Sequence, residues 1–215
     1  MQALSSEVSP ESPFRAMTLD DVAAAARVFA RAFFDDPIAH YVTPSESTRF
    51  RTLEAVLRPF LRYGVLYGEV HTTPGEPAAG AIWLGPDEWH IGEEGASRAG
   101  MDWIADEIGD EDYLRFTAYY DWMSKQHELL APATHLYLAV LAVDTHLQGQ
   151  GIGSGLIRNM TRRADEEGLV CYLETQQPKN VPLYQRHGFE VVLDTMEPVS
   201  RLRTWAFVRQ PQLSK

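Results

Sequence analysis

A glycine-rich turn between a predicted strand and a predicted helix constrains this chain more than any other feature. The unbroken apolar run 136–143 predicts a buried strand, and the helical spacing of apolar residues after residue 154 predicts a helix that ends near 167. Between them, residues 148–153 read Gln-Gly-Gln-Gly-Ile-Gly. Glycines let backbone N–H groups in such a turn converge on one point, and the N-terminus of the following helix adds partial positive charge there. The turn therefore predicts a site for a pyrophosphate, and hence a phosphate-bearing cofactor.

Two common phosphate-binding motifs fit this turn less well. A Walker A loop needs a lysine followed by serine or threonine after its last glycine, but Ser154 and Gly155 follow Gly153 here. A dinucleotide fingerprint needs a third glycine where Ser154 stands, although Glu174 ends the next predicted strand, where a ribose-binding acid would lie. That motif would also begin about two-thirds along the chain, which leaves little sequence for the rest of a dinucleotide-binding fold.

A third pattern accounts for the whole block from 136 to 189. A Gln-x-x-Gly-x-Gly turn follows a strand that ends in Val-Asp, and the block closes with Asn180, Tyr184 and Gly188-Phe189. This order and spacing resembles the acetyl-coenzyme A site of the GCN5-related N-acetyltransferases (GNAT). The resemblance is detailed over residues 135–192 and patchy over 16–130. Segments that further resemble the puromycin N-acetyltransferase-like branch are Ala32–Pro37, Trp83-Leu84, Tyr137–Val140, Tyr172–Thr175 and Asn180–Tyr184.

The resemblance implies an α/β chain with the GNAT fold, a mixed and mostly antiparallel central sheet flanked by helices in a single domain. The predicted element order of helices, strands, helices and then strand–helix–strand also favours a mixed sheet with helices on its faces. We expect the domain to cover 14–210, with the acetyl-coenzyme A core at 135–192. Residues 1–13 are rich in Ser, Pro and Glu, which predicts a disordered N-terminus.

The remaining elements follow from apolar spacing and turn residues. A helix should start after the cap at Thr18–Asp21 and end at Pro37, and the strand 136–143 should be buried on both faces. The other expected elements are helices at 46–63, near 93–107 and 110–129, 151–167 and 180–187, and strands at 65–72, 78–84, 169–175, 189–194 and 199–208.

The resemblance also assigns the cofactor site. It places the backbone of Leu141, Ala142 and Val143 along the pantetheine arm, because the family's strand carries a bulge that leaves backbone groups free. Asn180 would form a hydrogen bond to the pantetheine arm; alternatively, it serves only as a helix N-cap. The turn would wrap the pyrophosphate by its backbone, or it is a plain tight turn. The residues of the turn are Gln148, Gly149, Gln150, Gly151, Ile152, Gly153 and Ser154. On the helix that follows, Arg158, Arg162 or Arg163 would reach the adenosine phosphate; alternatively, these arginines are solvated surface residues.

Catalysis is assigned in the same way. The resemblance puts Tyr184 near the cofactor sulfur, where a phenol with a pKa of about 10 stays protonated and can donate to the departing thiolate. The alternative is a tyrosine that only packs a short helix. Glu174 is the leading candidate for the general base, acting through water, or it is a structural or solvent-exposed acid. Weaker candidates are His135, Tyr137, His127 and Asp35, and a desolvated small amine needs no side-chain base at all.

Charge and aromatic residues bear on the acceptor. The formal net charge is −11; residues 1–130 hold 22 acidic and 10 basic side chains, and residues 131–215 hold 8 and 9. The acidic part would attract a cationic amine, or it is simply a solvated surface. A nucleic-acid partner is not expected, because it needs a basic surface. Six aromatic residues would form a wall of the acceptor site for a ring-bearing amine, or alternatively they belong to the hydrophobic core. They are Phe33, Phe34, Trp83, Trp89, Tyr119 and Trp122.

We therefore expect an enzyme that transfers acetyl from acetyl-coenzyme A to the primary amine of a small molecule. Transfer to a hydroxyl, transfer of another acyl group, and a non-catalytic acyl-coenzyme A-binding module stay open. No metal is expected. The single cysteine, Cys171, excludes an intrachain disulfide, no apolar run approaches the ~20 residues of a membrane span, and the N-terminus does not resemble a secretory signal. These features predict a cytoplasmic protein without a membrane partner, and a homodimer stays open.

Overall fold

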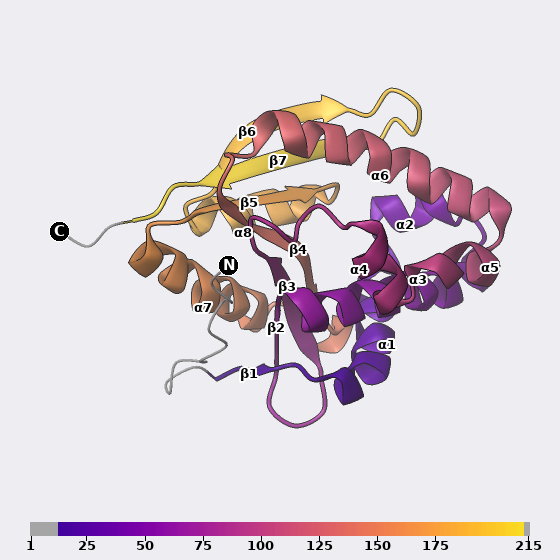
Figure 1. The fold of residues 1–215 in the computed structure, drawn as a ribbon, viewed down its shortest axis with the longest axis horizontal. Coiled ribbons are helices and arrows are strands. Elements are labelled where there is room, and N and C mark those ends of the chain that lie inside the picture. Colours follow the sequence, from indigo (N-terminus) through magenta and orange to yellow (C-terminus); the bar gives the residue numbers. More distant parts are fainter. Residues whose placement is uncertain (1–12, 213–215) are drawn as a thin grey trace.

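The computed structural model describes residues 13–212, which form one domain around a seven-stranded sheet (Figure 1). The strand order is β1-β2-β3-β4-β5-β7-β6, and only the β4–β5 pair is parallel. The predicted fold class, a mixed and mostly antiparallel sheet flanked by helices, is confirmed. The disorder expected at 1–13 falls, apart from Pro13, outside the described residues. The strands are β1 (Arg15–Ala16), β2 (Glu69–Thr72), β3 (Ala79–Leu84), β4 (His135–Val143), β5 (Val170–Thr175), β6 (Glu190–Met196) and β7 (Arg203–Arg209).

Helices cover both faces of the sheet, as Figure 1 shows with α7 on one side of the central strands and α1 and α3 on the other. The α-helices are α1 (Val22–Phe33), α2 (Pro37–Val42), α3 (Glu46–Tyr67), α4 (Glu93–Ala99), α5 (Ile104–Ile108), α6 (Asp110–Leu130), α7 (Ile152–Glu167) and α8 (Val181–Arg186). Short 3-10 turns are η1 (Leu19–Asp21), η2 (Met101–Trp103), η3 (Thr145–Leu147) and η4 (Pro178–Asn180).

The alternation of strand β3 divides the core between the two faces. Ala81 and Trp83 pack into the cluster that α7 and α8 complete, whereas Ile82 and Leu84 pack into the cluster under α1 and α3. All six residues of β3 are buried, because successive side chains point to opposite faces and each face is covered. Cys171 is buried in β5, and burial raises the pKa of its thiol to about 12.

The structure corrects three sequence expectations that bear on how helices cover the sheet and where cavities open. Pro37 does not end α1, which stops at Phe33; it is the first residue of α2, whose N-cap is Asp36. Proline is favoured at this position because the N–H it lacks would have no helical partner. The strand expected at 65–72 starts only at 69, because α3 continues to 67. A Cβ on Gly64 would lie 2.7 Å from a methyl carbon of Ile82, so glycine allows the last turns of α3 to press against the sheet.

The third correction concerns β4. It was expected to be buried on both faces, but Ala139, Val140 and Leu141 are only partly buried. These residues line cavities described below, and an apolar run next to a binding cavity cannot be told from a core strand by hydrophobicity alone.

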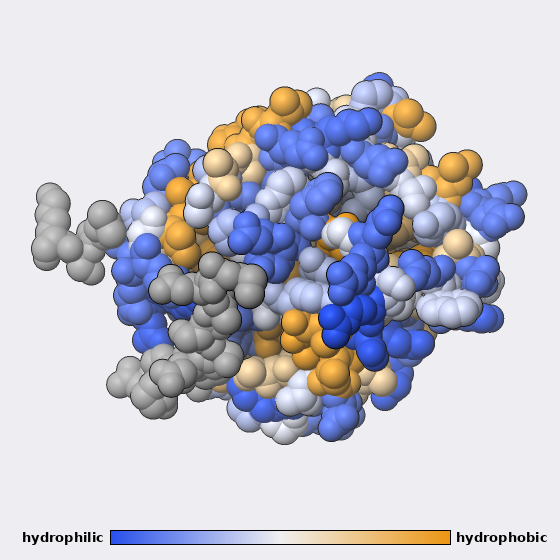
Figure 2. Space-filling model, in the orientation of Figure 1, coloured by the Kyte–Doolittle hydropathy of each residue, from blue (hydrophilic) through white to orange (hydrophobic). Residues whose placement is uncertain are grey.

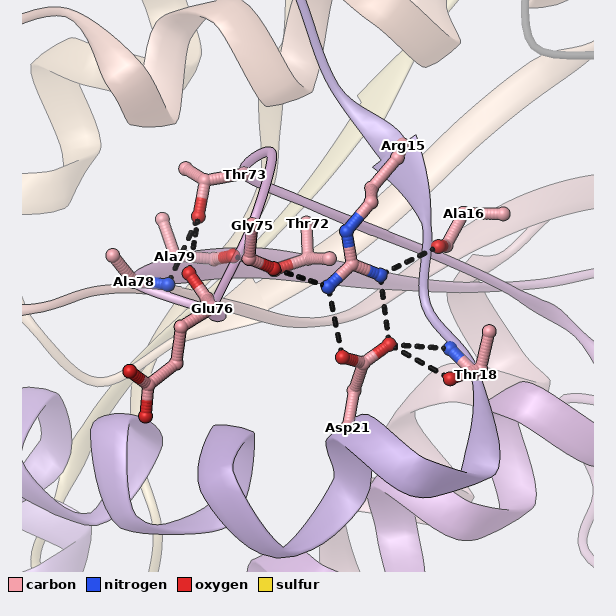
Figure 3. A network of polar contacts seen from close by, with 10 residues as sticks. All are labelled: Arg15, Ala16, Thr18, Asp21, Thr72, Thr73, Gly75, Glu76, Ala78 and Ala79. Carbon is pink, nitrogen blue, oxygen red and sulfur yellow. Dashed lines mark hydrogen bonds and ion pairs between the residues drawn. The ribbon is translucent and has the colours of Figure 1, made fainter.

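A polar network ties the start of the chain to the β2–β3 hairpin (Figure 3). The Arg15 guanidinium donates to both carboxyl oxygens of Asp21, at 2.7 and 2.8 Å, and to the backbone carbonyl of Gly75. Asp21 in turn accepts from the backbone N–H of Thr18 at 2.8 Å. The hydrogen bonds from Arg15 hold the pKa of Asp21 well below its usual range. The network fixes β1 and the start of α1 against the hairpin.

The face drawn in Figure 2 is largely hydrophilic, with apolar groups near β6 at its upper edge. β6 is the terminal strand of the sheet, and Val191, Val192 and Met196 are exposed on it. In the described part of the chain, no helix combines the length and apolar character needed to cross a membrane.

Candidate active site

Near its middle, strand β4 loses regular backbone pairing with both of its neighbouring strands. Ile82 of β3 pairs with Val140, and the next residue, Trp83, pairs with Leu138, so Ala139 is an extra residue in β4. Such a bulge bends the strand and interrupts its ladder. On the other edge the registered pairs with β5 end at Tyr137. The backbone of β4 beyond Tyr137 is therefore available to another extended, amide-bearing chain, as the resemblance implied.

The glycine-rich turn has the backbone that only glycine adopts readily. Gly149 and Gly151 have φ of 78° and 83°, and a Cβ on either would meet no atom within 4 Å. Glycine is needed here for conformation rather than for packing. The first backbone bond of α7 runs from the Gly155 N–H to the Gly151 carbonyl at 2.9 Å, so the N–H groups of 152–154 have no partner within the helix.

A groove of about 490 Å³ runs from the end of α1 across β4 and the turn to η4 and α8; we call it the cofactor groove. Arg31, Lys179 and Arg186 line it beside the N-terminus of α7, which suits a polyanion. Among the residues expected to bind the cofactor, Gln150 and Tyr184 do not line this groove. Those that do are Leu141, Ala142, Val143, Gln148, Gly149, Gly151, Ile152, Gly153, Ser154 and Asn180.

Side chains around the glycine-rich turn stabilise it through an ion pair and hydrogen bonds. Arg31 forms an ion pair with Asp144, the buried residue that follows β4, and this pair lowers the pKa of the Asp144 carboxyl. The Gln148 amide donates to the Val143 carbonyl at 3.1 Å. Gln150 donates to the His146 carbonyl at 3.3 Å, so its side chain supports the turn from outside the groove.

A second cavity, of about 140 Å³, lies on the other side of the β4 bulge, and we call it the acceptor cavity. Helices α2, α3 and α6 supply its apolar walls, with Val42, Val56 and Phe116 among the lining residues. Four residues line both the acceptor cavity and the cofactor groove, which shows that the two meet beside β4. They are Phe33, Asp36, Leu141 and Asn180.

Tyr184 lies in this wall, although it lines the acceptor cavity and not the cofactor groove. It is 6% exposed and packs its ring against Phe189 and Phe207, with centroids 6.1 and 5.5 Å away. Burial raises the pKa of its phenol, and the carboxyl of Asp36 raises it further. The phenol therefore keeps its proton at neutral pH, as a proton donor must.

Asp36 is the site residue that sequence reasoning missed, since only its exposed neighbour Asp35 was considered. Its carboxyl caps α2 by accepting from the Ile38 N–H at 3.1 Å and is nearly fully buried. Burial raises the pKa of Asp36 to about 6. The hydrogen bond from the Ile38 N–H and the charges of Lys179 and His40 lower this pKa by smaller amounts. The Asp-Asp-Pro pattern signals a cap before a Pro-initiated helix, and that signal was available in the sequence.

Glu174 is buried rather than solvent-exposed, with 3% of its side chain accessible. It lines the acceptor cavity and a further cavity of about 200 Å³ behind it, next to Trp89 and His127. The His127 Nδ1 lies 3.3 Å from Glu174 Oε1. Burial raises the pKa of the Tyr137 phenol, and the Glu174 charge raises it further. The exposed-acid alternative for Glu174 is therefore excluded.

Two histidines continue from Glu174 into the core. His127 Nε2 lies 2.8 Å from His135 Nε2, and His135 Nδ1 lies 2.6 Å from the Pro132 carbonyl, to which it must donate. Burial lowers the pKa of His135, so its Nε2 accepts and His127 Nε2 donates. His127 therefore links Glu174 to His135, although neither carboxyl oxygen of Glu174 accepts a hydrogen bond from a described residue.

The other sequence candidates are divided between cavities, core and surface. Phe33 and Tyr119 line the acceptor cavity, and Trp89 stacks on His127 with ring centroids 4.2 Å apart. Trp83 belongs to the core, and Phe34 stacks against Arg49. Arg163 is held by Glu69 and Glu167, whereas Arg158 and Arg162 line a surface hollow beside α7. Among the described residues, no group of three or more His, Cys, Asp or Glu side chains could hold a metal ion.

Known proteins share both the fold and the sequence pattern. A solved histone acetyltransferase HPA2-related protein from Corynebacterium glutamicum matches with a TM-score of 0.63 at 20% identity, over 94% of this chain and 97% of the other. Arylalkylamine N-acetyltransferase 2 from Aedes aegypti matches with a TM-score of 0.52 at 16% identity, over 93% and 98%. An uncharacterized N-acetyltransferase of Schizosaccharomyces pombe is 27% identical over 180 residues, 79% of this chain and 70% of its own. Residues 79–189 match the model of the acetyltransferase (GNAT) family. This chain therefore belongs to that family and is an acyltransferase that uses acetyl-coenzyme A.

Proposed function

We propose that the protein transfers the acetyl group of acetyl-coenzyme A to a primary amine of a small molecule. The observation that carries this proposal is the meeting of the cofactor groove with the acceptor cavity beside the bulge of β4. A cavity of only about 140 Å³ suits a small acceptor better than a protein segment. The Aedes aegypti enzyme of the same fold is, by its name, an arylalkylamine N-acetyltransferase, which supports an amine acceptor.

The groove fits acetyl-coenzyme A on its own chemistry. Positive-φ glycines whose missing Cβ atoms face open space let a phosphate approach the backbone, and the N-terminus of α7 with Lys179 and Arg186 would neutralise it. The backbone of Leu141, Ala142 and Val143 would pair with the pantetheine amides, and Asn180 would bond the same arm. A backbone N–H freed at the bulge is available to the thioester oxygen as negative charge develops there.

The chemistry divides between two side chains. The amine nitrogen attacks the thioester carbon, a C–N bond forms and the C–S bond breaks. Tyr184, whose phenol is protonated, donates its proton to the departing sulfur. Glu174 receives a proton that the amine loses, through water, and His127 Nδ1 lies 3.3 Å from its Oε1. Both carboxylate and imidazole are buried, so the proton passes between groups shielded from bulk solvent.

Finer assignments belong to the same proposal. The segments 32–37 and 180–184 support a place in the puromycin N-acetyltransferase-like branch, so puromycin belongs among the acceptors tested. The lone cysteine supports a cytoplasmic location.

The test is release of coenzyme A thiol from acetyl-coenzyme A across a panel of primary amines, with the matching alcohols and with longer acyl donors as comparisons. We expect turnover with amines and a product acetylated on nitrogen. Turnover with the alcohols alone would replace this proposal with O-acetylation, faster turnover with a longer acyl donor would replace the acetyl group, and binding of acetyl-coenzyme A without turnover of any acceptor would leave a binding module.

A further inference from the structure

Asp36 lies where the acceptor nitrogen has to be. The amine must enter the acceptor cavity and reach the thioester in the cofactor groove, so its nitrogen lies at their boundary. Of the residues that line both spaces, Phe33, Leu141 and Asn180 carry no charge, and Asp36 is the ionisable one. Tyr184 is close enough for the Asp36 charge to act on its phenol. Both residues line the acceptor cavity, so the carboxyl shares this space with the group assigned to protonate the sulfur.

The charge of the acceptor cavity has one sign. Two carboxyl groups line it: Asp36, which also lines the cofactor groove, and Glu174, which His127 approaches from outside the cavity. No Lys, Arg or His is among its lining residues. In a buried, apolar surrounding an unpaired carboxylate is costly, and a cation that enters removes that cost. Lys179 and His40 act on Asp36 as nearby charges rather than as hydrogen-bond partners. The cavity is thus arranged to attract a cation and to exclude an acid.

The rest of the cavity is built for an apolar group. Its walls include Ile38, Val42, Val56 and Leu57, and the rings of Phe116 and Tyr120 stand 4.5 Å apart at their centroids. The volume of about 140 Å³ compares with an engineered apolar cavity of about 150 Å³ that takes up benzene. One aromatic ring, or an aliphatic group of that size, fills it.

We propose that Asp36 is the ammonium-binding residue of the acceptor site, and that the acceptor is a primary ammonium carried on an uncharged apolar body of about one ring. One oxygen of Asp36 stays on the Ile38 N–H, and the other receives the ammonium. The ammonium then gives one proton to Glu174 through water before attack, and the proton that the nitrogen loses after attack passes to the Tyr184 oxygen, which has given its own proton to the sulfur. This inference rests on the proposed function, since it identifies the acceptor class of the same site.

The experiment measures binding, so that it does not depend on turnover. The protein is first saturated with coenzyme A, and its dissociation constants for 2-phenylethylamine and 2-phenylethanol are compared at pH 7.5 by titration calorimetry. The two probes have nearly the same shape, but only the amine is charged at this pH. The variants are Asp36→Asn, which retains a capping oxygen, and the control Asp35→Asn, whose native carboxyl is 91% exposed.

We expect the wild type and Asp35→Asn to bind the amine at least about tenfold more tightly than the alcohol, as a charge-assisted hydrogen bond gives. In Asp36→Asn the two probes should bind about equally, while coenzyme A binds as in the wild type. A preference that survives in Asp36→Asn, a preference lost instead in Glu174→Gln, or a wild type that binds neither probe would overturn the inference and leave acetyl transfer intact. Failure of coenzyme A itself to bind would overturn the proposed function along with it.

Discussion

Replacement of Asp36 by asparagine should stabilise the folded protein at neutral and alkaline pH. Burial raises the Asp36 pKa from 3.8 to about 6, so the folded state holds the proton more tightly than the unfolded chain does. A carboxyl whose pKa is raised by folding stabilises the folded state fully when the pH is below the pKa of that carboxyl in the unfolded chain. This contribution is lost as the pH rises through the pKa in the folded state. The shift of about 2 units corresponds to about 3 kcal/mol at 1.36 kcal/mol per unit.

Asparagine carries no charge at any of these pH values and is as good an N-cap as aspartate. The Asp36→Asn variant should therefore gain up to about 3 kcal/mol over the wild type at pH 8, and about half of that at pH 5. For a domain of this size, the full gain raises the melting temperature by roughly 6–12 °C. Urea unfolding followed by circular dichroism at pH 5, 6, 7 and 8 measures the difference directly.

The control is Asp35→Asn, whose native side chain is 91% exposed and which should change stability by less than about 0.5 kcal/mol at every pH. A destabilised Asp36→Asn variant would mean that the capping interaction with the Ile38 N–H outweighs the cost of the buried charge. A gain that does not change between pH 5 and pH 8 would also refute the reasoning, because only titration of the carboxyl makes it pH-dependent.

Other variants test the remaining parts of the site. Gly151→Val should abolish acetyl-coenzyme A binding in a folded protein, because its φ of 83° is unfavourable for valine, and isothermal titration checks this; normal binding would mean that the loop is only a turn. Tyr184→Phe should lower kcat by roughly 10²–10⁴-fold with little change in the KM for acetyl-coenzyme A, and unchanged kcat under rate-limiting chemistry would make the tyrosine structural. Glu174→Gln should lower kcat in the same range, whereas Asp36→Asn should chiefly raise the amine KM; steady-state kinetics separate the two, and the reverse pattern would exchange their roles. Wild-type kcat/KM should fall below about pH 6 as Asp36 is protonated, and a pH profile should lack that limb in Asp36→Asn.

The cofactor side of the site could be predicted because it depends on local backbone chemistry. Positive φ at Gly149 and Gly151, the start of α7 after them, and Asn180 beside the groove all follow from short patterns in one segment. The bulge at Ala139 leaves no such pattern in the apolar run, and only the family resemblance implied it.

The acceptor side could not be predicted, because it depends on contacts between distant segments. Asp36 and Phe116 belong to helices far apart in sequence, and β4 brings them to one cavity. Likewise, nothing in the local sequence indicates that His127 meets Glu174 at 3.3 Å and His135 at 2.8 Å. Trp83 and Trp89 look alike in sequence, yet the first fills the core and the second lines a cavity.

The most direct test of the central claim is thermal unfolding of the protein with acetyl-coenzyme A, NAD or ATP at equal concentrations. A ligand that binds only the folded state adds about 2.7 kcal/mol of stability at a hundredfold excess over its Kd. We predict a clear rise in melting temperature with acetyl-coenzyme A, little change with NAD or ATP, and no rise with any of them in Gly151→Val. A rise with NAD and none with acetyl-coenzyme A would contradict the assignment of the groove.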